Sequence, residues 1–228
     1  MSDALYEAAD AGDLVKVRTL LAKGASRFAA NEDNGQYPFM NALTLPVRYS
    51  LDLKQRKEDI FNLLRPEFPD IHNYVDRSGE TMVHYLIKFD YAEPLSYLMR
   101  QAAASADYSI FSKGNNFDQK PIHAAIMCKR EDMVADLLQI PNMKTTMDWN
   151  NRNLIHHMAH YGTPAMLRSY CDSLTKVQLF EYINATDIDG KTPYQFAKDY
   201  NSTDDRSEIM EILVAHGATV YRSFSPFE

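Results

Sequence analysis

A turn followed by two short helices is the feature that most restricts the fold of this chain, and residues 187–218 show it in full. Gly190 predicts a tight turn, since glycine tolerates left-handed backbone. Thr192 and Pro193 then predict the start of a helix, because threonine caps helices and proline is favoured at the first helical position. A second helix is expected over 206–215, where apolar residues recur at helical spacing. Such a unit cannot bury both of its faces alone, so it predicts neighbours of the same kind.

Similar helix starts recur along the chain. They begin at Asp3, Tyr37, Thr81, Lys120, Asn153 and Thr192. Some of the intervals are close to a period of about 33 residues, and the others are longer. The additional residues are expected in a loop and longer helix near 54–64, in a helical continuation over 101–107 and in extra helical turns over 175–182. Of the 8 glycines, all except Gly114 fall in the turns or just after helices, which supports a repeat.

This pattern resembles the ankyrin repeat, whose helices start with Thr-Pro-Leu-His-x-Ala. Thr192-Pro193 and the run from Lys120 to Ala125 (KPIHAA) carry the resemblance, and His84, His123 and His156 take the place of the signature histidine. The family uses that imidazole to bond the backbone of the turn, called the finger. The resemblance implies an all-α solenoid of about six repeats with short β-hairpin fingers, in a single domain over 1–228. The repeats are expected near 2–31, 32–73, 74–114, 115–147, 148–186 and 187–220.

Composition excludes several classes of function. Lys and Arg number 24 against 31 Asp and Glu, so the net charge is −7. Nucleic-acid and anionic-membrane binding both need a basic surface, so neither is expected. The two cysteines suit a reducing compartment, and no signal peptide or run of about 20 apolar residues is visible. We therefore expect a cytoplasmic monomer without a cofactor.

The resemblance implies a non-catalytic module that binds a protein partner on a concave face made of fingers and first helices. The family's variable positions on that face, carried over to this sequence, give Arg77, Lys88, Phe89, Phe117, Gln119, Met127, Trp149, Arg152, His160, Tyr161, Ile188, Lys191 and Tyr200. Large aromatic and arginine side chains dominate the binding energy of protein interfaces. Trp149 is expected at the centre of the surface. Alternatively, inserted helices or the tail 221–228 cover these aromatic residues, which then pack as core.

A zinc site is the alternative of another class, because His156, His157 and His160 place two imidazoles one helical turn apart. Against it, His156 occupies the structural histidine position, and no acidic or cysteine ligand is expected nearby. A cysteine nucleophile is also disfavoured. Cys128 lies on a different side of its helix from His123, and Cys171 is expected in the core.

Two further interpretations concern modification and origin. Asn184 and Asn73 each begin an Asn-x-x-Asp turn, which in ankyrin repeats can be β-hydroxylated, although the amide can simply close the turn. The irregular, lengthened repeats resemble those of intracellular bacteria. This similarity leaves open a secreted bacterial effector that acts in the host cytoplasm.

Overall fold

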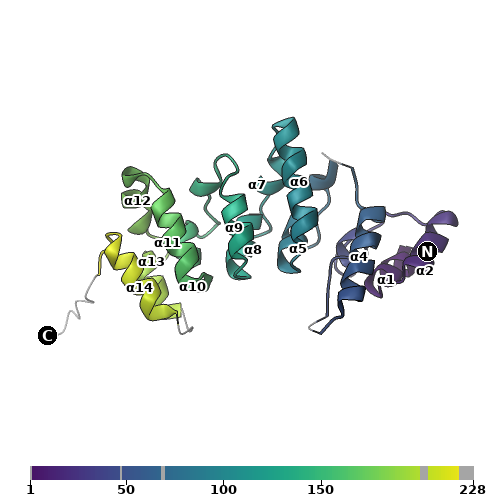
Figure 1. Cartoon of the computed structure of the whole chain (residues 1–228), viewed down its shortest axis with the longest axis horizontal. Helices are drawn as coiled ribbons and strands as arrows, with labels where there is room; N and C mark the ends of the chain where they lie inside the picture. Colours follow the sequence, from purple (N-terminus) through teal and green to yellow (C-terminus); the bar gives the residue numbers. More distant parts are fainter. Residues whose placement is uncertain (1, 47, 68–69, 201–204, 221–228) are drawn as a thin grey trace. The chain divides into compact units, whose positions relative to one another are not determined.

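The computed structural model describes residues 2–46, 48–67, 70–200 and 205–220, without the side chains of Ser2, Ile71, His72 and Tyr200. It divides into two compact units, Met1–Asn116 and Phe117–Glu228, which are called the first and second unit below. The described residues are mostly helical (Figure 1). The all-α prediction is therefore confirmed for these residues, while the repeat count and the single domain over 1–228 stay predictions. The tail 221–228 lies outside the described residues.

The first unit contains seven α-helices and one 3₁₀ helix among its described residues. They are α1 (Ser2–Asp10), α2 (Leu14–Ala22), α3 (Pro38–Asn41), α4 (Leu51–Leu64), η1 (Asp70–Asn73), α5 (Met82–Lys88), α6 (Ala92–Ser105) and α7 (Ser109–Ser112).

The second unit, over its described residues, has the same alternation of elements with one inserted helix. Its elements are α8 (Pro121–Met127), α9 (Glu131–Leu137), η2 (Met143–Thr145), α10 (Leu154–Tyr161), α11 (Pro164–Ser173), α12 (Lys176–Ile183), α13 (Pro193–Tyr200) and α14 (Arg206–Ala215).

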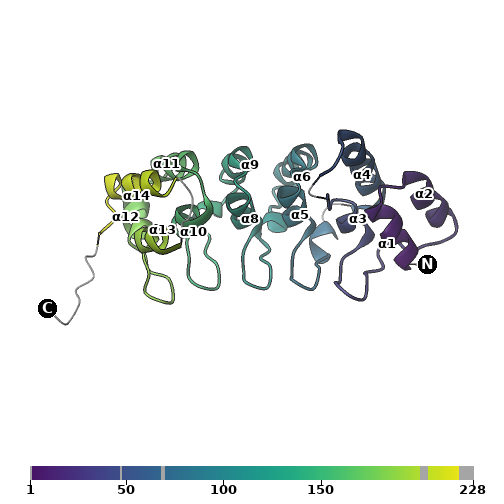
Figure 2. The same ribbon diagram turned by 90° about the horizontal axis from the view of Figure 1, so that it is seen from below.

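Helices pack as antiparallel pairs inside each unit, as the sequence pattern predicts. In the second unit α8 packs on α9 and α10, and α13 packs on α10 and α14. Figure 2 shows α8, α10 and α13 in one row, with the fingers projecting away from α9, α11 and α14. In the first unit α1 packs on α2 and α3, and α5 packs on α6. Buried aliphatic residues such as Ile122, Leu154 and Ile212 fill the space between the two rows of the second unit.

The signature histidines hold the helix starts, which confirms their predicted structural role. The Thr81 amide donates to Nδ1 of His84 at 3.1 Å, and the Lys120 amide donates to Nδ1 of His123 at 2.9 Å. His156 instead contacts the backbone of the following finger, with Nε2 3.1 Å from the Lys191 carbonyl. His84 and His123 therefore each bond the backbone amide just before a helix, and His156 joins its helix to the next finger.

The fingers are turns in which β-structure is limited to isolated bridges. Among the described residues, the only β-pairings are the single bridges Val75–Thr81 and Met147–Asn153, so hairpin fingers are not confirmed. Glycine is needed at position 79, where its finger approaches Asn116. Gly79 has φ 75°, and a Cβ atom there would lie 2.8 Å from the Asn116 amide nitrogen. In the second unit Asp118 and Asn151 take the left-handed conformation, with φ 53° and 58°, which these residue types tolerate.

The insertions are helical. Helix α4 begins at Leu51, earlier than the sequence suggested, because the Ser50 side chain accepts from the Leu53 amide at 3.1 Å. Helix α6 continues to Ser105 as predicted. The residues after α11 form the separate helix α12, which Thr175 caps. None of the described helices is both long enough and apolar enough to cross a membrane.

Candidate functional site

Buried aspartates close two fingers of the second unit. Oδ1 of Asp187 accepts from the amides of Asp189 at 3.0 Å and Lys191 at 2.9 Å. Asp148 makes the same two bonds to Asn150 and Arg152, at 2.9 and 3.0 Å. An aspartate side chain that bonds the backbone two residues ahead closes a turn without strand pairing. The turn residues are thereby fixed in position.

Backbone hydrogen bonds also join neighbouring fingers. The Trp149 amide donates to the Phe117 carbonyl at 3.1 Å, and the Ile188 amide donates to the Asn150 carbonyl at 3.0 Å. The three finger tips of the second unit therefore stand side by side in a fixed order.

The side chains at these tips are large, apolar and exposed. Phe117, Trp149 and Ile188 keep 61%, 71% and 66% of their surface accessible to solvent. We call these three residues the tip row. The alternative prediction, that inserted helices cover the aromatic residues, is wrong for Phe117 and Trp149 within the described residues. Ordered, contiguous apolar surface of this kind is typical of a binding site.

The charged residues below the tip row are paired with one another. Nε of Arg152 lies 3.2 Å from Oδ2 of Asp187, and its guanidinium stacks 4.6 Å from the centre of the Phe196 ring. Lys191 pairs with Asp199 at 2.8 Å. Both cations were predicted to contact a partner, but the structure shows that they already stabilise the base of the fingers.

Other predicted residues of the second unit lie at the ends of the first helices. Met127 is exposed at the end of α8, and Gln119 is half-buried in the finger before it. The half-buried rings of His160 and Tyr161 stack with centroids 3.7 Å apart at the end of α10. Burial, followed by the nearby His157 and Arg152, lowers the pKa of His160. The side chain of Tyr200 lies outside the described residues.

The remaining predicted contact residues belong to the first unit. Arg77 is exposed at a finger tip, and its guanidinium donates to the Glu32 carbonyl. Lys88 pairs with Glu80, and the half-buried Phe89 packs against the Tyr85 ring, with centroids 6.2 Å apart. These three residues therefore surround a polar finger, whereas the tip row is apolar.

The three histidines proposed as zinc ligands are engaged separately. His156 contacts Asn153 and the Lys191 carbonyl, whereas Nε2 of His157 lies 3.2 Å from Oδ2 of Asp148. The expectation of no acidic residue near the cluster is thus wrong, because Asp148 packs its buried carboxylate against His157. No group of three His, Cys, Asp or Glu side chains in the described part of the chain is arranged to hold a metal ion.

The contact between Asp148 and His157 was not predicted, because nine residues separate the two in the sequence. Burial alone would raise the pKa of Asp148, but hydrogen bonds from His157 and the Arg152 amide outweigh it and lower that pKa. Its position as the first residue of the finger could have indicated such a contact. The equivalent aspartate of the next finger, Asp187, also pairs with a side chain, that of Arg152.

Cys171 and the two asparagines considered for hydroxylation lie in different surroundings. Cys171 is buried in α11, as predicted, and burial raises the pKa of its thiol to about 12. The Asn184 amide reaches the Gly217 carbonyl and the Thr219 amide, at 3.0 and 2.7 Å. It therefore holds the segment after α14, and the interpretation that it closes its own turn is wrong. Asn73 is exposed at the end of η1, and hydroxylation of either asparagine stays a prediction.

Comparison with known proteins gives two relatives by sequence. The chain is 27% identical over 146 residues to the rat nuclear factor NF-kappa-B p105 subunit, a match that covers 64% of this chain but 14% of that protein. It is 25% identical over 144 residues to the putative ankyrin repeat protein FPV223 of fowlpox virus (strain NVSL), which covers 63% of this chain and 92% of the viral protein. No family model matches the chain.

Two solved structures have a similar fold. One is a chain of the complex between the Bd0816 predatory endopeptidase of Bdellovibrio bacteriovorus and immunity protein Bd3460, with a TM-score of 0.64 and 22% identity over 94% of this chain and 98% of that one. The other is an ankyrin repeat domain from Acinetobacter baumannii AYE, with a TM-score of 0.62, 17% identity and the same coverage. These similarities confirm the resemblance that the motifs indicated, and the chain has the fold of the ankyrin repeat proteins.

Proposed function

We propose that this chain is a non-catalytic interaction module, and that it binds a protein partner on the face formed by fingers and first helices. The ankyrin repeat relatives support the general role of protein interaction. One similar solved structure belongs to a complex with an immunity protein, which is consistent with this role but says nothing of the partner here.

The tip row carries the proposal. Phe117, Trp149 and Ile188 expose apolar side chains on three adjacent turns. Inter-finger hydrogen bonds join the three turns, and the buried Asp148 and Asp187 close those of Trp149 and Ile188. A preorganised apolar surface loses little conformational entropy on binding. Since Arg152 and Lys191 are already neutralised by Asp187 and Asp199, we infer that apolar contact with the tip row supplies most of the affinity. The fingertip charges would then set orientation and specificity.

The experiment is affinity capture from lysate of the source cell or a candidate host, with the native chain and the Phe117→Ala/Trp149→Ala double variant as bait. We expect the native chain to retain a specific protein that the double variant loses. Truncation of a central aromatic side chain at an interface costs about 2 kcal/mol or more, which is about a thirtyfold loss of affinity.

The matched control is Phe180→Ala, because Phe180 lies on α12 in the same unit and is 77% exposed. This variant should retain the partner. Melting temperatures of all variants should agree within about a degree, since exposed side chains contribute little to stability. Equal capture by the double variant, or equal loss with Phe180→Ala, would contradict the proposal.

A role as a secreted bacterial effector would use the same surface in a host cell. The lengthened elements α4, α6 and α12 agree with the irregular repeats that suggested it. A translocation assay with a reporter fused to the chain tests it, and failure of the reporter to reach the host cytoplasm would remove this origin without affecting the proposed interface.

A further inference from the structure

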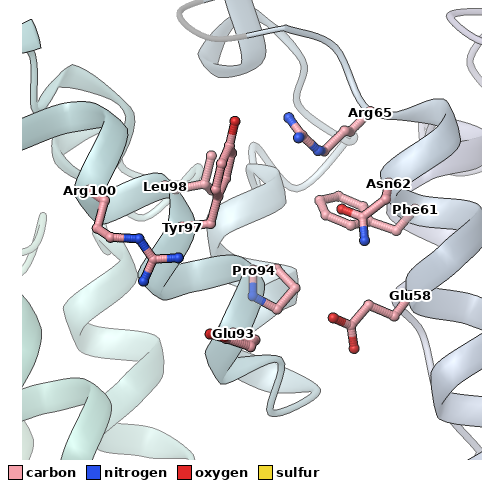
Figure 3. Close-up of a pocket in the computed structure, with 9 residues that line it drawn as sticks. All are labelled: Glu58, Phe61, Asn62, Arg65, Glu93, Pro94, Tyr97, Leu98 and Arg100. Atoms are coloured by element: carbon pink, nitrogen blue, oxygen red, sulfur yellow. The ribbon is translucent and has the colours of Figure 1, made fainter. Parts of the chain in front are cut away.

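A groove lies between α4 and α6 of the first unit, away from the fingers. Its cavity measures about 320 Å³, which is small for a ligand pocket. The buried residues Phe61, Pro94 and Leu98 form its apolar floor. Figure 3 shows these side chains with Glu58, Glu93, Arg65 and Arg100 around them.

Two carboxylates stand at one end of the groove. Glu58 comes from α4 and Glu93 from the first turn of α6, and Figure 3 shows both at the same end. Neither forms an ion pair or hydrogen bond with a residue that the structure describes. The nearby ammonium of Lys54 is used elsewhere, since it donates to the Asp90 carbonyl at 2.6 Å. This end of the groove therefore carries two carboxylates without an ion-pair partner among the described residues, although the charge of Lys54 acts on Glu58.

The surroundings of Glu58 raise the pKa of its carboxyl group. Burial raises its pKa most strongly, Lys54 acts in the opposite direction, and the charges of Asp59 and Glu93 raise it further. A cation between Glu58 and Glu93 would relieve this repulsion.

Neither arginine of the groove pairs with Glu58 or Glu93 among the described residues. Arg65 stacks its guanidinium on the ring of Tyr97, 5.0 Å from the centroid, and lies at the opposite end in Figure 3. Arg100 lines the side of α6 farther along the helix. The groove itself therefore supplies no arginine partner to either glutamate within the described residues.

The second unit shows how such a groove is neutralised. Between its second helices α11 and α14, Arg168 reaches across and pairs with Glu208 at 3.1 Å. In the first unit, Arg65 crosses from α4 to α6 but stacks on Tyr97 and does not pair with a glutamate among the described residues. An arginine supplied from outside would complete the same arrangement.

We propose that the groove between α4 and α6 receives an arginine side chain of a protein partner, with the guanidinium between Glu58 and Glu93. The aliphatic stem of arginine suits the floor of Phe61, Pro94 and Leu98, because such stems cover apolar surface while the head stays with polar groups. A guanidinium also presents several donors in a plane, so it bonds two carboxylates at once. This surface is independent of the tip row.

The experiment is titration of the full ¹⁵N-labelled chain with N-acetyl-arginine amide, followed by NMR. N-acetyl-citrulline amide, which has nearly the same shape and no charge, is the comparison probe. We expect arginine to shift the amide signals of Asn62, Tyr97 and Leu98, and citrulline to shift them far less. The Glu58→Gln/Glu93→Gln variant should bind the arginine probe about tenfold more weakly, because two partly exposed ion pairs are lost.

Two control variants and two comparison probes decide the outcome. Glu181→Gln removes an exposed carboxylate of α12 and should leave the titration unchanged. Trp149→Ala should also leave it unchanged, which separates failure of this proposal from failure of the tip row. Equal shifts with citrulline, an unaltered response of the glutamine variant, or tighter binding of spermidine (a small polycation rather than a protein side chain) would each overturn the proposal.

Discussion

The fingers of the two units use one turn design but present different side chains. In the first unit Oδ1 of Asp76 accepts from the amides of Ser78 and Glu80 at 2.8 and 2.9 Å, and the tip carries Arg77. In the second unit Asp148 and Asp187 make the same bonds, and the tips carry Trp149 and Ile188. The aspartate determines the turn and leaves the tip residue free to vary. Recognition can therefore change from finger to finger without a change in the fold.

The units differ again between their second helices. Arg168 neutralises Glu208 in the second unit, whereas Glu58 and Glu93 stay unpaired among the described residues of the first. An apolar tip row and an acidic groove thus belong to different units. We therefore expect a substitution in one surface to leave binding at the other surface unchanged.

The largest effect is expected from Asp187→Ala. The carboxylate of Asp187 is fully buried, closes its finger and pairs with Arg152, so its loss leaves two amides and a guanidinium without their acceptor. We expect a loss of about 4 kcal/mol in the free energy of unfolding, measured by urea denaturation. Asp189→Ala is the control, because the Asp189 side chain is 64% exposed. Asp76→Ala in the first unit, where the aspartate is less buried, should cost less, and an equal cost would remove this distinction between the fingers.

Alanine at two finger glycines tests how closely the fingers approach. Gly79 and Gly190 have nearly the same φ, 75° and 77°, but a Cβ atom at Gly79 meets Asn116 and one at Gly190 meets nothing within 4 Å. We expect Gly190→Ala to cost about 1 kcal/mol for the left-handed backbone. Gly79→Ala should cost about 3 kcal/mol because of the added steric clash. Thermal denaturation of both variants measures the difference, and equal losses would show that Asn116 can move away from the Gly79 turn.

Acid should weaken the second unit through His156. Burial lowers the pKa of His156 from 6.5 to about 4, against the opposing effects of the Lys191 carbonyl and Asp187. Below pH 6.5 the unfolded chain binds a proton that native His156 does not, so the free energy of unfolding falls until about pH 4. Between pH 7 and 4.5 this loss amounts to about 2 kcal/mol.

Urea denaturation followed by Trp149 fluorescence, which reports on the second unit, tests this dependence on pH. His156→Gln keeps a polar side chain without the titration, and its stability should fall by about 2 kcal/mol less than that of the native chain over the same pH range. Parallel pH profiles for the two proteins would assign the acid sensitivity to other groups.

The smallest effect is expected at the turn after α8. Lys129 has φ 54° there, whereas Gly12 occupies the matching turn after α1 with φ 68°. Lys129→Gly should relieve backbone strain and raise the free energy of unfolding by about 0.5 kcal/mol, after the greater entropy of glycine and the loss of an exposed ion pair with Asp205 are included. A lower melting temperature for this variant would mean that the ion pair outweighs the strain.

The sequence predicted the features that depend on local residues. Gly190 and Thr192-Pro193 marked a turn and helix start, and the predicted helix 206–215 coincides with α14. The positions of Phe117, Trp149 and Ile188 in the fingers were also predicted, but whether the aromatic residues are exposed was left open. The family pattern supplied these positions, since composition alone does not distinguish an exposed aromatic residue from a core residue.

Pairings between distant residues could not be predicted. Arg152 meets Asp187 in the next finger, and the groove of Glu58 and Glu93 depends on where α4 and α6 begin. The start of α4 was missed because Ser50 caps it outside the repeat pattern. Each of these contacts depends on packing between helices or fingers, which spacing in the sequence does not determine.

The most direct test of the central claim measures the dissociation constant of the captured partner for Trp149→Ala and Arg77→Ala, one fingertip residue from each unit. The apolar tip row predicts a loss of about thirtyfold or more for Trp149→Ala and a change of less than about threefold for Arg77→Ala, with both variants as stable as the native chain. An undiminished affinity of Trp149→Ala, or a larger loss for Arg77→Ala, would contradict the assignment of binding to the tip row.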